Sequence, residues 1–312
     1  MAAAEPDLVR QPFDGWRAHE PGQHSELRIY DLERGSDSLL LHAGDAVIEA
    51  PNWSTDGRWL IVNRDGLLYR VAVDGDAILQ LIETGSLADS NNDHALSADG
   101  RFIYSSSKNG HLYEIPFEGG VARQVTDEAD GLLKRYLHGV SPDGKHLAFI
   151  GAQQTDAGVT YNVFTAAVAG GAVRELTHSP KQHDGAEYSP DGRWLYFNSE
   201  RESVAAGHAQ LFRMGVDGSG IQQLTFDDRV NWFPHLSPDG RWMLYLSYQP
   251  GTQNHPPNRD VQLRLARPDG SDSVVLVSLF GGQGTVNVNS WAPDSRRFAY
   301  VSYPIEGDAA LL

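Results

Sequence analysis

The chain has 312 residues, with 32 glycines, 16 prolines and no cysteine, and its 41 acidic and 25 basic side chains give a formal net charge of −16. A chain of this length can bury a large core without disulfide or metal staples, and the absence of thiols excludes Cys-based metal sites, redox motifs and Cys nucleophiles. The acidity disfavours nucleic acid or an anionic membrane as a partner, because either would be repelled.

The N-terminal segment carries no export signal. Met1-Ala-Ala-Ala-Glu-Pro-Asp lacks a basic region followed by an apolar run, and no apolar stretch is long enough to span a membrane. The sequence as given therefore predicts a soluble, cytoplasmic protein. Loss of a leader peptide would make a periplasmic location equally consistent.

A turn-like element recurs along the chain. Its copies are Ser54-Thr55-Asp56-Gly57, Ser97-Ala98-Asp99-Gly100, Ser141-Pro142-Asp143-Gly144, Ser189-Pro190-Asp191-Gly192, Ser237-Pro238-Asp239-Gly240 and the degenerate Ala292-Pro293-Asp294-Ser295. Their aspartates are 43, 44, 48, 48 and 55 residues apart. This period is typical of a four-stranded propeller blade and too long for leucine-rich or ankyrin repeats.

The chemistry of the element favours a hairpin. Proline presets φ, Asp bonds its own backbone, and Gly accepts the left-handed conformation that closes a tight turn. Strand-like runs rich in aromatic and β-branched residues follow, such as 58–62, 193–197 and 241–245. No segment shows capped helical periodicity, so we expect an all-β protein.

The two ends of the chain complement each other. The last copy supplies two strands, around 286–291 and 297–303, and the segment before the first copy supplies two more, 26–31 and 38–42. Joining them completes a sixth blade and removes exposed edges. We therefore predict one closed six-bladed β-propeller of four-stranded antiparallel blades over 24–312, preceded by an arm over 1–23.

The residues just before each turn element should surround one mouth of the central channel. Polar and titratable side chains recur in this ring: Asn52, Asp93, His94, His138, Asp184, Glu187, Asn231, His235 and Asn289. Trp232 and Phe233 lie in the same ring and are candidates for stacking against a sugar. Each histidine can also be an ordinary hydrogen-bonded group between blades.

Two longer loops should open on the same face. The first, 247–260, contains His255, Asn258 and Arg259, and the second, 280–285, contains Gln283 among three glycines. Long loops on a rigid scaffold commonly carry function. The opposite face receives only tight hairpins, so we expect little binding capacity there.

Imidazole, carboxylate and amide groups suit a divalent metal. We predict a site for one ion (Mn, Fe, Zn or Ca) on His94, His138, His235 and Gln283, with Asp184 as an alternative ligand. His255, Glu187 and Asp184 are the candidate proton-transfer residues. Asn52, Asp93, Trp232, Phe233, Asn258, Arg259 and Asn289 are the candidate substrate contacts, and Arg259 alternatively pairs with Asp260.

The repeated element, Ser-Pro-Asp-Gly-Arg/Lys-x-Leu-x-Phe/Tyr with the later Glu175-Leu176-Thr177 and Gln223-Leu224-Thr225, resembles the PD40 repeat of TolB-like propellers over residues 26–303. The polar ring is also similar to that of oligogalacturonate lyases. This resemblance implies that such a ring can host metal-assisted sugar chemistry; it transfers no ligand residues to this chain.

Two functions therefore remain open. The first is a carbohydrate-active lyase or hydrolase, either metal-assisted or using paired carboxylates such as Asp184 and Glu187. The second is a non-catalytic propeller that binds a protein or a small polar ligand. We expect a monomer or weak oligomer in either case.

Overall fold

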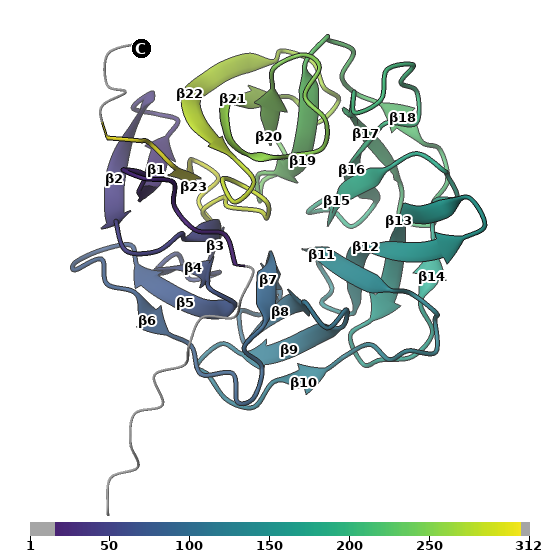
Figure 1. Ribbon diagram of the computed structural model, residues 1–312, viewed down its shortest axis with the longest axis horizontal. Coiled ribbons are helices and arrows are strands. Elements are labelled where there is room, and N and C mark those ends of the chain that lie inside the picture. The colour runs from purple at the N-terminus through teal and green to yellow at the C-terminus, as the bar shows by residue number, and fades with distance from the viewer. Residues whose placement is uncertain (1–15, 307–312) are drawn as a thin grey trace, which may run out of the picture.

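The computed structural model describes residues 16–306, which form a ring of six β-sheets around a central channel (Figure 1). The fold is an all-β, six-bladed propeller with four-stranded antiparallel blades, as predicted. Within the described range there is no helix, and hence none that could cross a membrane.

Five blades are continuous in sequence. They comprise β3 (Glu49–Trp53), β4 (Trp59–Arg64), β5 (Leu67–Ala72) and β6 (Gln80–Leu81); β7 (Ser90–Leu96), β8 (Phe102–Ser107), β9 (Leu112–Pro116) and β10 (Arg123–Gln124); β11 (Lys134–Val140), β12 (His146–Thr155), β13 (Gly158–Ala167) and β14 (Arg174–Glu175); β15 (His183–Tyr188), β16 (Trp194–Ser199), β17 (Gln210–Gly215) and β18 (Gln222–Gln223); and β19 (Val230–Leu236), β20 (Met243–Tyr248), β21 (Pro257–Ala266) and β22 (Val274–Gly282). We number these blades 1 to 5 in chain order. The first strand of each lies innermost (Figure 1).

The sixth blade joins the two ends of the described chain. β1 (Ser25–Asp31) pairs with β2 (Ser36–Ala43) on one side and with β23 (Arg297–Ser302) on the other. The predicted inner strand at 286–291 is reduced to a single bridge between Trp291 and Phe298. The carbonyls of Val286 and Asn287 accept hydrogen bonds from histidine rings of other blades, so they are not available for a regular ladder.

The turn elements hold the blades by local chemistry. In the fourth copy, Ser189 Oγ donates to Asp191 Oδ1 at 2.6 Å, and the Trp194 amide donates back to Ser189 Oγ at 2.9 Å. Gly192 has φ +69°, a conformation that side chains other than glycine rarely adopt. Because these hydrogen bonds join residues close in sequence, the turns could be predicted from the sequence alone.

Apolar side chains fill the interfaces between blades. Between blades 3 and 4, for example, Ile150 and Val163 pack against Leu195 and Phe197 in one buried cluster. One face of each sheet thus contacts the preceding blade and the other face contacts the next. The polar residues of the inner strands are left to line the channel.

Candidate functional site

The inner strands carry the polar ring that the sequence predicts. Asn52 lies on β3, Asp93 and His94 on β7, His138 on β11, Asp184 and Glu187 on β15, and His235 on β19. These residues lie within the inner strands. The sequence had led us to expect them in the loops that lead into those strands. Register shifts interrupt the pairing of these strands, for example between Asp184 and Glu187. Such bulges change which side chain points toward the channel.

A cavity of about 250 Å³ opens at this mouth of the channel. It lies where blades 2 to 5 converge with the 283–287 segment. Its lining is rich in amides, carboxylates and phenols: Asn91, Asn92, Asp93, Tyr136, Ile150, Tyr161, Gln182, Asp184, Phe233, Asn254, His255, Gln283 and Asn287. Such a lining suits a small ligand with many hydrogen-bonding groups.

Asp184 is the electrostatic centre of the cavity. Its Oδ1 lies 2.8 Å from His138 Nε2, and its Oδ2 lies 3.4 Å from His255 Nε2. Burial alone would raise the pKa of Asp184, but the two histidines hold it well below its usual range. The carboxylate is therefore ionised.

His138 is the cationic partner of this carboxylate. Its other nitrogen, Nδ1, faces the Asn287 carbonyl at 3.3 Å, so both ring nitrogens meet acceptors. Burial would lower the pKa of His138, but the hydrogen bond and charge of Asp184, with the charge of Asp93, raise it. The result is a buried imidazolium–carboxylate pair.

Asp93 has the opposite character. Burial raises its pKa, and the nearby Asp184 charge acts in the same direction while His138 opposes both. The Asn91 amide donates to Asp93 Oδ2 at 2.8 Å. Two carboxylates in one cavity thus have pKa values shifted in opposite directions, which is a common property of acid–base pairs.

His255 comes from the predicted loop between β20 and β21. Its Nδ1 is hydrogen-bonded to Gln283 Oε1, and its ring packs on Trp232 and Phe233 with centroids 4.5 and 5.2 Å away. Trp232 and Phe233 are fully buried in this structure. The prediction that Trp232 stacks against a sugar is therefore wrong, because Trp232 is buried and packs against the His255 ring. Phe233 forms part of the cavity wall.

Glu187 and His235 form a second network, which ties blades together. His235 Nδ1 lies 2.6 Å from Glu187 Oε2, and its Nε2 lies 2.8 Å from the Val286 carbonyl. Asn289 donates to Glu187 Oε1 at 2.6 Å, and Asn52 donates to the Asn289 carbonyl at 2.6 Å. These four residues are absent from the cavity lining, so the structure gives Glu187 a different place from the one predicted.

The predicted metal ligands do not converge. His94 is completely buried, neither ring nitrogen makes a well-formed hydrogen bond, and burial lowers its pKa to about 4. His138, His235 and Gln283 are committed to the separate partners given above. Across residues 16–306, no group of three or more His, Asp and Glu side chains is arranged to hold a metal ion. The residues present therefore do not fit a preformed metal site.

The rim of the mouth contains a residue that the sequence did not single out. Arg17 donates to Asn258 Oδ1 at 2.8 Å and to the Gln283 carbonyl at 2.7 Å, and it lies 3.2 Å from Glu49 Oε1. The segment from Trp16 thus packs over the rim; residues 1–15 of the predicted arm lie outside the described residues. Arg259, predicted to hold a substrate carboxylate, is exposed, and within residues 16–306 its hydrogen bond is to the Asn258 carbonyl.

Further lining residues also escaped the sequence argument. Tyr136 and Tyr161 come from β11 and β13, and Gln182 directly precedes β15. Of the three, Gln182 would have been the easiest to predict from the sequence, because it directly precedes His183-Asp184, and Asp184 belongs to the predicted ring. The tyrosines lie farther from the turn elements, and no motif marks them.

Fold and site together define a six-bladed propeller with a polar central mouth. A model of the TolB β-propeller domain, PD40, matches residues 138–268. The uncharacterized protein Atu1656 of Agrobacterium fabrum is 40% identical over 287 residues, covering 90% of this chain and 94% of that protein. The chain belongs to the TolB-like PD40 β-propeller family.

Solved structures agree with this assignment. A protein of Agrobacterium tumefaciens with a provisional TolB designation is 37% identical, with a TM-score of 0.83 over 91% of this chain and 99% of that one. An oligogalacturonate lyase in complex with manganese shares the fold at 14% identity, with a TM-score of 0.56 over 84% of this chain and 75% of that one. The latter likeness concerns the fold alone.

Proposed function

We propose that the central cavity binds a small polyhydroxylated ligand of the carbohydrate class and cleaves it by acid–base chemistry. The observation that supports this most directly is the pair of buried carboxylates, Asp93 and Asp184, whose pKa values are shifted in opposite directions within one cavity. The amide and phenol lining supports recognition of hydroxyl groups.

In this proposal each group has one task. Asp93, whose raised pKa favours the protonated form, donates its proton to the departing glycosidic oxygen as the C–O bond breaks. Asp184, kept ionised by His138 and His255, accepts a proton, and His255 is held beside it by Gln283. The proton comes from a water that attacks the anomeric carbon in hydrolysis, or from the carbon next to a uronate carboxylate in elimination. No step is routed through a metal ion.

Product analysis tests the proposal. The protein is incubated with oligogalacturonides and with neutral oligosaccharides; elimination yields an unsaturated sugar that absorbs in the ultraviolet, whereas hydrolysis yields only a new reducing end. Asp93→Asn and His255→Gln should each lower kcat by about 10²–10⁴-fold. Asp260→Asn, at an exposed position outside the cavity, is the matched control and should leave turnover unchanged.

A ligand-binding propeller without turnover is the second candidate. It is favoured by one observation: both oxygens of Asp184 are already occupied by histidines, as in a purely structural network. Calorimetric binding of an oligosaccharide with no product, and with the same affinity in His255→Gln, would select this candidate. Absence of both binding and turnover would overturn both.

A further inference from the structure

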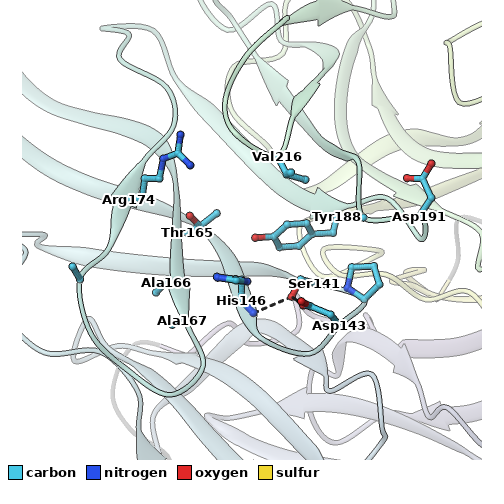
Figure 2. Close-up of a pocket in the computed structure, with 13 residues that line it drawn as sticks. Ser141, Asp143, His146, Thr165, Ala166, Ala167, Arg174, Tyr188, Asp191 and Val216 are labelled. Atoms are coloured by element: carbon cyan, nitrogen blue, oxygen red, sulfur yellow. Dashed lines mark hydrogen bonds between the residues drawn. The ribbon is translucent and has the colours of Figure 1, made fainter.

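A second cavity lies away from the central mouth. It has a volume of about 570 Å³ and lies between blades 3 and 4, beside the turn elements at Ser141–Asp143 and Asp191–Gly192 (Figure 2). The sequence predicted little binding capacity on this face, yet the structure has a cavity here. Tight hairpins close the edge of the face but do not fill the space between neighbouring blades.

The cavity exists because blade 3 departs from its own repeat. At the second residue after each turn Gly, blades 1, 2, 4 and 5 have Trp59, Phe102, Trp194 and Trp242, whereas blade 3 has His146. Two residues farther along the strand, Ala148 stands where blade 4 has Tyr196. Opposite Ala148 on the next strand, Thr165 stands where blade 4 has Arg213.

The interface between blades 4 and 5 shows what normally fills this space. The Trp194 ring stacks under the Arg213 guanidinium at 4.6 Å and packs against the apolar cluster that includes Leu236 and Met243. Trp59 with Arg70 and Trp242 with Arg267 make the same kind of stack, at 4.8 and 4.3 Å. Between blades 3 and 4 this indole-sized volume is left open.

The open volume also contains a polar group that lacks a partner. Tyr188 is only 9% exposed, and its hydroxyl makes no hydrogen bond within the described part of the chain. Its ring lies in the middle of the cavity with the hydroxyl directed toward Thr165 (Figure 2). Burial raises the pKa of Tyr188, so the hydroxyl keeps its proton. Because this hydroxyl faces the cavity, a polar group bound there can form a hydrogen bond with it.

We propose that the cavity between blades 3 and 4 is a binding site for an indole ring, in which the ring occupies the volume that tryptophan fills in blades 1, 4 and 5 and its N–H group bonds the Tyr188 hydroxyl. Ala166, Ala167 and Val216 supply apolar walls, and the Arg174 guanidinium lines the rim for a cation–π contact. The indole comes from a tryptophan side chain of a partner polypeptide or from a free indole compound.

Ligand-observed NMR and calorimetry on the full chain test this site. The probes are indole and N-acetyl-L-tryptophanamide, and a phenylalanine amide serves as a probe without the N–H group. We expect saturable binding of at least one indole probe. If only the tryptophan amide binds, the source is a polypeptide; if indole binds equally well, the ring alone is sufficient.

Variants distinguish the site from nonspecific binding. His146→Trp introduces the residue of blades 1, 4 and 5 and should reduce indole affinity by at least about tenfold through steric filling. Thr165→Arg fills the cavity from another strand and should reduce affinity in the same way. This second variant keeps the test valid if His146→Trp fails to fold. Tyr188→Phe should weaken binding about fivefold, the typical effect of one lost hydrogen bond.

Phe102→Trp is the matched control, because it places the same residue at the equivalent position of blade 2. It should leave affinity unchanged. Binding that survives both His146→Trp and Thr165→Arg, or no binding of either indole probe at millimolar concentration, overturns the proposal. Oligosaccharides should not compete with indole, so this result is independent of the central mouth.

Discussion

The carboxylate of Asp184 lies 2.8 Å from Nε2 of His138, and the other nitrogen of that ring faces only a backbone carbonyl. Since the ring has two acceptors and no donor around it, it must carry both protons to satisfy them. The pair is therefore a charged unit at the base of the cavity, and its contribution to stability depends on pH.

The contribution of the His138–Asp184 pair to stability should be greatest in mildly acidic solution. The raised pKa of His138 makes its contribution complete below the unfolded pKa of about 6.5, and the contribution is lost as pH rises through the folded pKa. The lowered pKa of Asp184 makes its contribution complete above about pH 3.9, and that contribution is lost as pH falls. Urea unfolding across this pH range measures both slopes.

Asp184→Asn should remove the alkaline slope and lower the free energy of unfolding by about 3 kcal/mol near pH 6, because it leaves a buried imidazole without its counter-charge. Asp260→Asn should retain the wild-type profile, since that carboxylate is exposed. An unchanged alkaline slope in Asp184→Asn would contradict the ion-pair interpretation.

Glu187→Ala should destabilise the propeller without affecting ligand binding at the mouth. The variant breaks the pair with His235 and the bond from Asn289, both of which join different blades. We expect a loss of about 2–4 kcal/mol in the free energy of unfolding. Glu187→Gln, which keeps the shape and one acceptor, should lose less. If Glu187→Ala instead abolished turnover at unchanged stability, the catalytic role first predicted for Glu187 would be restored.

Three features of the structure were predictable from the sequence: the blades, the grouping of polar residues at one mouth, and the closure of the ring. The blades were predictable because each turn is built from neighbouring residues such as Ser189 and Asp191, whose hydrogen bonds need no distant partner. The meeting of His138 and Asp184 at one mouth also followed from the repeat, which places corresponding residues on one face, and His255 was expected there because its long loop opens on that face. Closure by strands from both ends was predicted for the same reason.

The partners of each ring residue were not predictable. A bulge of one residue turns a strand's side chains to the other face, and the sequence does not mark every bulge: Gly185 signals the one in β15, but others have no glycine. Phe233, for example, adopts φ +56° at a register shift of β19, although no glycine signals it. His94 consequently ends in the interior and not among metal ligands, and Arg17 reaches the mouth from a segment without any repeat.

Arg17→Ala should loosen the segment that precedes β1. Arg17 stacks 3.9 Å from the Tyr303 ring and donates to Asn258 and to the Gln283 carbonyl. Loss of these contacts should speed hydrogen exchange at the amide of Gln23 by about tenfold. Arg259→Ala is the control, because within residues 16–306 that exposed side chain bonds a neighbouring carbonyl. Equal exchange in both variants would show that Arg17 does not hold the segment.

Chelation should leave the protein unaffected. No three His, Asp and Glu side chains within residues 16–306 are grouped to hold an ion, so we expect less than about a tenth of an equivalent of transition metal in protein purified without a metal-affinity tag. Elemental analysis measures the content, and unfolding with and without EDTA measures the effect on stability. A stoichiometric metal whose removal lowers the melting temperature would restore the predicted metal site.

The pairing of β1 with β23 has a consequence for biosynthesis. β1 leaves the ribosome before any strand of blades 1 to 5, and β23 leaves after all of them, so the nascent chain carries an unpaired edge of β1 while those blades are made. Blades 1 to 5 can assemble as they emerge, but the ring can close only once β23 is available, through a contact of very large sequence separation. Until that moment the growing protein is an open stack exposed to intermolecular strand pairing, and the ring is completed by the docking of β23 on β1.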